Sequence, residues 1–276
     1  MENLIFSEEI GKNKFLKFIF SFFVLLTIWW VAISIRDLRG DIENNIFTLI
    51  YPFFSLIGFI AGLHVSRKWG GFKSYLGGSI LMFSFGLLAQ FFGQAMYAYF
   101  IYIKGIDVPY PSVGDVGYFG SVIFYILGVI LLAKVSGIKI SFKSLNGKLQ
   151  SILIPLVLLM ISYIFFLKGH GFDFSDKLRI FLDFGYPLGQ AVYVSIAILA
   201  LLMCRNTLGG LMKNPITLVI VALIFQYFSD FTFLYQASID TWFVGGINDF
   251  MYLMSYFLMT LSLVQLGSSF EKIKNG

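Results

Sequence analysis

Four aspartates lie inside long apolar stretches of the chain, where an ionised carboxylate is costly. They are Asp115, Asp183, Asp230 and Asp249. A carboxylate in apolar surroundings can bind a cation, exchange a proton, or divide acid and base roles with a second carboxylate in catalysis. These positions are therefore the first candidates for a functional site.

Three of these aspartates belong to a recurring Asp-x-x-Tyr pattern. Its copies are Asp115 with Tyr118, Asp183 with Tyr186, and Asp249 with Tyr252, and a degenerate copy has Thr48 before Tyr51. The anchor positions 48, 115, 183 and 249 are 67, 68 and 66 residues apart. A fixed period of this length indicates tandem structural repeats. On a helix, each Tyr lies about one turn from its Asp on the same face.

Amides accompany the acids in two of the apolar stretches. Residues 88–94 (LAQFFGQ) align with residues 224–230 (IFQYFSD), so that Gln90 matches Gln226 and Gln94 matches Asp230. Residues four apart share one helix face. We expect one polar cavity, with Asn248 beside a ligand-binding set of ten residues: Asp183, Asp230, Asp249, Asp115, Gln90, Gln94, Gln226, Tyr118, Tyr186 and Tyr252.

The composition indicates that membrane-spanning helices position these residues. The 276 residues are 58% hydrophobic and 13% charged, whereas soluble domains carry about 25% charged residues. Eight apolar runs are long enough to cross a bilayer core of about 30 Å as helices, and they lack the alternation of barrel strands. They lie at about 15–35, 46–65, 75–103, 113–135, 149–168, 178–203, 215–238 and 244–267.

Basic residues are distributed unevenly over the connecting loops. The terminal segments and the loops after each even-numbered run hold 14 Lys and Arg, and the other loops hold 6. By the positive-inside rule, both termini are then cytoplasmic and the aspartates lie towards the outer leaflet. We therefore expect an all-α integral membrane protein with one domain over residues 1–276. Its four tandem hairpin repeats of about 67 residues would lie at about 15–67, 75–135, 149–204 and 215–267.

The formal charge of +5 follows from this topology. It does not indicate a nucleic-acid partner, because no basic patch interleaved with aromatic residues lies outside the apolar runs. His64, His170 and the single Cys204 form no group with metal-ligand spacing, so we expect no metal and no cofactor. The sequence also lacks a nucleophile elbow, a P-loop and a zinc-protease motif.

Two of the aspartates have a structural alternative to a functional role. Ser112-x-x-Asp115 resembles a capping box, and Asp249 follows Gly245 and Gly246 at the start of its run. A first-turn acid that caps a helix explains either residue as well as a site does. Asp183 is different, because it lies about two turns into a helix expected to start near residue 175 or 176.

Residues 110–118, followed by an apolar helix, resemble the polytopic membrane sensory regions of prokaryotic signalling proteins. In those proteins a pattern close to Tyr/Phe-Pro-Ser-x-x-Asp-x-x-Tyr is found before diguanylate cyclase or histidine kinase modules. The resemblance covers about residues 109–132, and its matching residues are Tyr110, Pro111, Ser112, Asp115 and Tyr118. Because no cyclase or kinase motif follows residue 267, we expect this region to lack an output module of its own. The resemblance therefore implies a sensory domain of the cell membrane that acts on a separate cytoplasmic signalling partner.

Three functions stay open on the sequence alone. A sensory, ligand-responsive module would bind a small ligand, a cation or a proton from the outside, in a polar pocket near the outer leaflet. A transporter of small solutes or ions is favoured by the parallel repeats and by the kinks that Pro52 and Pro187 predict. An intramembrane enzyme would use paired aspartates on a lipid. Because no nucleophile is evident, we expect a protein without enzymatic activity.

Overall fold

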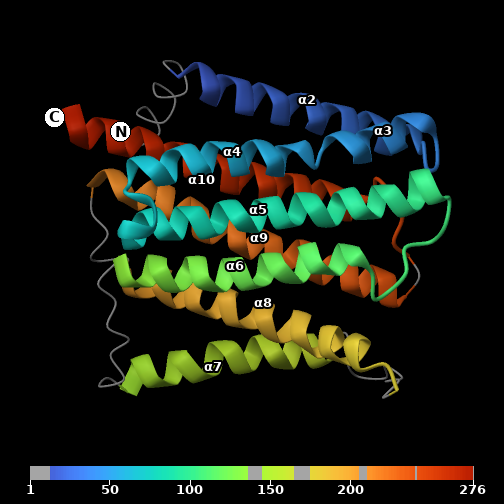
Figure 1. Cartoon of the computed structure of the whole chain (residues 1–276). Coiled ribbons are helices and arrows are strands. Elements are labelled where there is room, and N and C mark those ends of the chain that lie inside the picture. The colour runs from blue at the N-terminus through green and yellow to red at the C-terminus, as the bar shows by residue number, and fades with distance from the viewer. Residues whose placement is uncertain (1–12, 136–144, 165–174, 205–209, 240, 276) are drawn as a thin grey trace.

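The computed structural model describes residues 13–135, 145–164, 175–204, 210–239 and 241–275. These residues form helices and connecting turns, and none of them forms a strand. The long helices lie side by side and run in alternating directions, with α2 and α7 on opposite sides of the bundle (Figure 1). Seven helical segments among the described residues are long and apolar enough to cross a membrane. The protein is therefore a multi-pass integral membrane protein.

The helix boundaries follow most of the predicted runs. The helices are α2 (Lys14–Arg36), α3 (Ile42–Ile50), α4 (Phe53–Lys68), α5 (Tyr75–Ala98), α6 (Val113–Val135), α7 (Leu145–Ser162), α8 (Lys177–Cys204), α9 (Lys213–Ser238) and α10 (Ile247–Asn275). A π-helical segment, Tyr99–Lys104, extends α5. The last helix continues well beyond the run expected at 244–267.

The run expected at 149–168 corresponds to α7, whose described part ends before residue 168. This helix is not among the seven candidate spans, so the count of eight stays a prediction. The same holds for the cytoplasmic placement of both termini and for the four repeats. At the edge of the bundle, α7 packs against α8.

Side-chain caps and prolines set several of the helix ends. The Asn13 side chain accepts hydrogen bonds from the first turn of α2. Asp176 does the same for α8, accepting from the amides of Leu178 (3.1 Å) and Arg179 (3.0 Å). Pro52 separates α3 from α4, which confirms the predicted interruption there. Pro187 lies inside α8, which continues through it.

Small residues allow α4, α5 and α10 to approach closely in the half of the bundle that contains the C-terminus. A Cβ atom on Gly62 would lie 2.0 Å from the Ser84 hydroxyl oxygen, and one on Gly267 would lie 2.8 Å from a methyl group of Val65. These helices leave no room for a larger residue at either position. Of the spans, α5 and α10 are the most buried.

Candidate functional site

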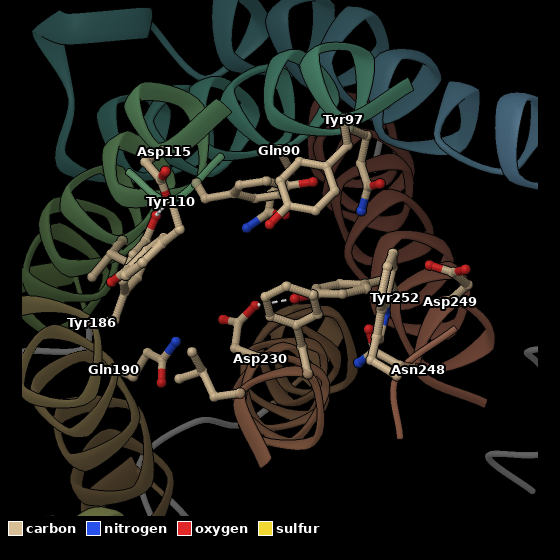
Figure 2. Close-up of a pocket in the computed structure, with 16 residues that line it drawn as sticks. Gln90, Tyr97, Tyr110, Asp115, Tyr186, Gln190, Asp230, Asn248, Asp249 and Tyr252 are labelled. Atoms are coloured by element: carbon tan, nitrogen blue, oxygen red, sulfur yellow. Dashed lines mark hydrogen bonds between the residues drawn. The ribbon is translucent and has the colours of Figure 1, made fainter. Parts of the chain in front are cut away.

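A polar cavity lies among α5, α6, α8, α9 and α10, at the end of the bundle opposite the C-terminus (Figures 1 and 2). It forms where the last turns of α5 and α9 meet the first turns of α6 and α10. Its volume is about 60 Å³. At about 15 Å³ for each water, this is room for about four water molecules or a small polar group.

The structure brings together eight of the ten residues that the sequence placed in one cavity. Those that line it are Gln90, Gln94, Asp115, Tyr118, Tyr186, Asp230, Asp249 and Tyr252. Asn248 lines it as well. Gln226 lies behind Asp230 and donates a hydrogen bond of 2.9 Å to its carboxylate. Asp183 lines an adjoining, larger hollow instead.

Asp115 acts both as a helix cap and as a cavity residue. Its Oδ2 accepts hydrogen bonds from the backbone amide (2.7 Å) and the hydroxyl (3.2 Å) of Ser112, as in a capping box. Its Oδ1 accepts from the Tyr186 hydroxyl of α8 at 2.8 Å. The two alternatives left open by the sequence are therefore compatible, because each uses a different oxygen.

Asp249 repeats this arrangement at the start of α10. Its Oδ2 accepts from the Gly245 amide at 2.5 Å, and its Oδ1 accepts from the Tyr51 hydroxyl at 2.8 Å. Two bonds from other helices fix the turn before α10. Trp30 Nε1 donates to the Gly245 carbonyl at 3.1 Å, and Asn44 Nδ2 donates to the Val244 carbonyl at 2.6 Å.

Asp230 lies deeper in α9 and has no capping role, because it is far from the start of its helix. Its Oδ1 accepts from the Tyr252 hydroxyl (2.9 Å) as well as from Gln226. The Gln190 amide of α8 points towards Asp230 across the cavity (Figure 2). Behind the cavity, the Ser255 hydroxyl donates to Gln226 at 2.8 Å.

Helices α5 and α6 are joined by a similar amide contact. Gln90 Nε2 donates to the Ser121 hydroxyl at 2.8 Å, and the Tyr256 hydroxyl donates to Gln90 Oε1 at 3.0 Å. Ser121 and Ser255 each lie six residues after the aspartate of their hairpin. Thus the two glutamines that the sequence aligned both bond to a serine on the following long helix.

The three cavity carboxylates share one electrostatic feature. Their hydrogen-bond donors are neutral: tyrosine hydroxyls, backbone amides, a serine and an amide side chain. Among the described residues that line the cavity there is no Lys, Arg or His. Asp115, Asp230 and Asp249 are each less than a tenth exposed. The cavity therefore holds three buried carboxyl groups that no described cationic side chain of its lining accompanies.

A larger hollow of about 1060 Å³, which we call the vestibule, adjoins the cavity. The two share an aromatic collar, defined as Tyr97, Tyr110, Tyr186, Phe233 and Trp242. Within the collar, the rings of Tyr97, Phe233 and Trp242 lie edge to face, with centroids 5.7–6.5 Å apart. The collar therefore separates the inner acids from the vestibule.

Polar residues of the vestibule surround Tyr110. Its hydroxyl donates to Asp183 at 2.8 Å, and the Arg179 guanidinium lies 5.8 Å from the centre of its ring. Partial burial, together with the Asp183 carboxylate, raises the pKa of Tyr110 above its usual value. The Tyr110 phenol therefore stays protonated and keeps its hydrogen bond to Asp183, where the vestibule adjoins the cavity.

Several lining residues were not predicted from the sequence. Gln190 lies seven residues, or two turns, after Asp183, so helical periodicity could have identified it. Tyr110 was present in the motif but had no assigned role. Tyr97, Phe233 and Trp242 carry no signal that separates them from the other aromatic residues of this chain.

The described residues contain no group of three or more His, Cys, Asp or Glu side chains close enough to hold a metal ion. The carboxylates are instead spread around the cavity wall (Figure 2). This arrangement suits a ligand that makes separate hydrogen bonds in several directions.

We expect Tyr186→Phe to lower the free energy of unfolding by about 1–2 kcal/mol, because Asp115 loses a buried hydrogen-bond donor. The matched control is Tyr193→Phe, two turns later on α8. The Tyr193 hydroxyl is buried without a hydrogen-bond partner, so its removal should not destabilise the protein. Thermal unfolding of both variants in the same detergent checks this. Equal melting temperatures would show that the bond to Asp115 contributes nothing.

No known protein-family model matches the chain, and no curated protein or solved structure matches it.

Proposed function

We propose that the protein is a sensory, ligand-responsive membrane module whose ligand enters the polar cavity from the outside. One observation carries the proposal: three buried carboxylates from α6, α9 and α10 line one cavity at a single end of the bundle. The uneven distribution of basic residues supports an outward-facing position for this end. The vestibule would be the route by which a ligand reaches the acids.

The hydrogen bonds at the cavity offer a way for binding to alter the helix arrangement. The bond from Tyr186 to Asp115 joins α8 to α6, and the bond from Tyr252 to Asp230 joins α10 to α9. A ligand that bonds to either carboxylate competes with the tyrosine. It thereby stabilises an arrangement in which the two helices are placed differently.

Helix α10 would carry this change to the other side of the membrane. It has 29 residues, which corresponds to about 43 Å of helix. Asp249 lies in its first turn, and Glu271 near its other end forms a 2.5 Å ion pair with Lys68 of α4. Trp69 Nε1 also donates to the Leu266 carbonyl at 3.0 Å. A separate cytoplasmic signalling partner would bind the C-terminal end of α10 and respond to its position.

The repeat architecture belongs to the same proposal. In the second and fourth hairpins, the glutamine is hydrogen-bonded to a serine of the following helix: Gln90 donates to Ser121, and Gln226 accepts from Ser255. These contacts support a common origin for the two hairpins. Four such hairpins would give eight spans with both termini in the cytoplasm. The cavity would then lie between repeats, where movement of one hairpin against another changes its shape.

A transporter is the second candidate, because the break between α3 and α4 lies beside the site through the bond from Tyr51 to Asp249. Interrupted helices at binding sites are common in transporters. The close contacts of Gly62 and Gly267 in the opposite half favour a binding module over a route through the bundle. Uptake into proteoliposomes of any ligand that binds separates the two functions.

The experiment that tests the binding proposal is a thermal-shift screen of small polar compounds with three proteins: wild type, Asp230→Asn, and the control Asp37→Asn. The Asp37 side chain is exposed and lies outside the cavity. A ligand present at 100 times its dissociation constant stabilises the protein by about 2.7 kcal/mol. We expect this stabilisation in wild type and Asp37→Asn, and its loss in Asp230→Asn.

Compounds that stabilise all three proteins equally would contradict the assignment of the cavity as the binding site. So would a screen in which no compound depends on Asp230. An Asp230→Asn protein that melts at the wild-type temperature without ligand would show that its lost response is not a folding defect.

A further inference from the structure

The chemistry of the cavity identifies a class of ligand, and this step rests on the binding function proposed above. We propose that the cavity binds a primary ammonium group, carried on an apolar body that occupies the vestibule. Four independent features of the described residues support this: charge, an unpaired acceptor, aromatic walls and the shape of the two hollows.

The first feature is a group of three buried carboxyl groups without a cationic partner among the described lining residues. Asp115, Asp230 and Asp249 are buried and receive hydrogen bonds from neutral donors, and no described cationic side chain lines their cavity. Buried charges are normally paired, because removal from water costs several kcal/mol per ion. A positively charged ligand supplies the counter-charge that the protein itself does not place in the cavity.

The second feature is a buried acceptor that the fold leaves without a donor. Asn248 is 1% exposed, and its Nδ2 donates to the Ser229 carbonyl at 2.7 Å. That bond fixes the orientation of the amide, yet its Oδ1 has no hydrogen-bond partner. Buried acceptors are nearly always satisfied, and Asn248 lines the cavity. The missing group is therefore a donor, as an N–H of the ligand would be.

The third feature is the aromatic surroundings of the acids. Tyr97, Tyr118 and Tyr252 line the cavity, and the rings of Tyr97 and Tyr118 meet at 85° with centroids 5.4 Å apart. Ammonium groups are attracted to the faces of aromatic rings, and rings that surround a site form cages for them. Among the described residues, the walls also hold a buried donor without a hydrogen-bond partner, the Nε1 of Trp242, which matches an acceptor on the ligand beside its ammonium group.

The fourth feature is the division into a small inner hollow and a large outer one. An ammonium group has three N–H donors, which match several acceptors spread around a cavity of about 60 Å³. The vestibule of about 1060 Å³ is lined largely by apolar residues, including Ile101, Leu182, Pro187 and Leu234. The ligand is thus amphiphilic, with its charged end innermost.

Direct binding to the purified full chain tests the inference with four six-carbon probes: n-hexylammonium, hexyltrimethylammonium, 1-hexanol and hexanoate. Each is titrated by thermal shift into wild type, Asp230→Asn and Asp37→Asn in the same nonionic detergent. We expect n-hexylammonium to bind wild type and Asp37→Asn, and to bind Asp230→Asn at least about tenfold more weakly, equivalent to ~1.4 kcal/mol. Partition of the probe into micelles is the same for all three proteins, and the Asp37→Asn control shows the effect of removing a carboxylate outside the cavity.

The other probes decide which chemistry is recognised. Hexanol and hexanoate are expected to bind at least about tenfold more weakly than n-hexylammonium, because they lack the positive charge. Hexyltrimethylammonium is expected to be weaker as well, because it has no N–H for Asn248. Equal or tighter binding of any of these three would overturn the inference, as would no Asp230-dependent binding of n-hexylammonium.

Failure of the inference and failure of the proposed function give different results. If another compound of the screen binds in an Asp230-dependent way, the cavity is a ligand site and only the ammonium assignment is wrong. If no compound, amine or otherwise, depends on Asp230, the binding function itself is wrong.

Discussion

Gly117→Ala is expected to lower the free energy of unfolding by about 3 kcal/mol, because its Cβ would meet backbone atoms of α5. That Cβ would lie 2.5 Å from the Ala89 carbonyl oxygen and 2.6 Å from the Gly93 nitrogen. Backbone atoms of a packed helix cannot rotate away as a side chain can. The strain is therefore relieved only if α5 and α6 separate.

The matched control is Gly120→Ala, one turn later on the same helix. A Cβ at this position meets nothing within 4 Å. Alanine in a helix is more favourable than glycine by about 0.5–1 kcal/mol, so this variant should be as stable as wild type or slightly more stable. Chemical or thermal unfolding of both variants gives the comparison. Similar losses for the two would show that the α5–α6 contact is not close at Gly117.

The same substitution bears on the site, because Gly117 lies between Asp115 and Tyr118, which both line the cavity. Separation of α5 from α6 would widen the cavity and move Asp115 and Tyr118 away from Gln90 and Gln94 on α5. Any Asp230-dependent ligand response should therefore be weakened in Gly117→Ala and retained in Gly120→Ala.

Gly245→Ala is expected to have an effect of similar size, about 3 kcal/mol, from two causes that add. Gly245 has a φ of +77°, which an L-residue with a Cβ adopts at a cost of about 1–2 kcal/mol. Its Cβ would also lie 1.7 Å from Oδ1 of Asn44. To relieve the clash, Asn44 must give up its bond to the Val244 carbonyl.

Gly40→Ala separates these two causes. Gly40 has a φ of +80°, and a Cβ there meets nothing within 4 Å. It should therefore show only the backbone cost, about 1–2 kcal/mol. Melting temperatures of the two variants measure the difference, which represents the contact with Asn44. If both variants melt at the same temperature, the turn before α10 adapts freely and does not fix Asp249.

The broad architecture and much of the cavity could be predicted from residue types and spacing. Long apolar runs predicted the helices, since few charged residues interrupt them. The capping-box pattern at Ser112 and the glycine pair before Asp249 predicted that Asp115 and Asp249 lie in the first turns of their helices, where the structure has them. The alignment of Gln90 with Gln226 also identified side chains that occupy similar positions in two hairpins.

The bonds between residues of the pattern could not be predicted in this way. Within one helix, a Tyr three residues after an Asp lies on the same face, so both side chains face the same neighbouring helices. Tyr186 therefore reaches Asp115 on α6, and Tyr252 reaches Asp230 on α9, rather than the aspartates of their own copies. These pairings depend on how neighbouring helices are rotated and shifted, which a repeat period does not determine.

The surroundings of Asp183 could not be predicted from the repeat period either. Its helix begins at the Asp176 cap, and Asp183 lies in the second turn of α8, as its distance from the expected helix start predicted. The corresponding tyrosine, Tyr186, still reaches the cavity, whereas Asp183 faces the vestibule and Tyr110. The partners of Trp242 and Tyr110 depend on loop paths, for which apolar periodicity gives no information.

The two carboxylate oxygens of Asp115 bond to different helices, and this affects how the helices assemble after they enter the bilayer. The Oδ2 atom of Asp115 accepts a hydrogen bond from the Ser112 amide at the start of α6. The Oδ1 atom accepts its hydrogen bond from the Tyr186 hydroxyl, which is in place only when α8 packs beside α6. Helices that are already inserted associate through packing and polar contacts. A wrong neighbour would leave the second oxygen without a donor, at a cost that apolar surroundings make high. Asp115 therefore helps to select the correct neighbour for α6 during biogenesis, and Asp249 does the same for α10 through Tyr51.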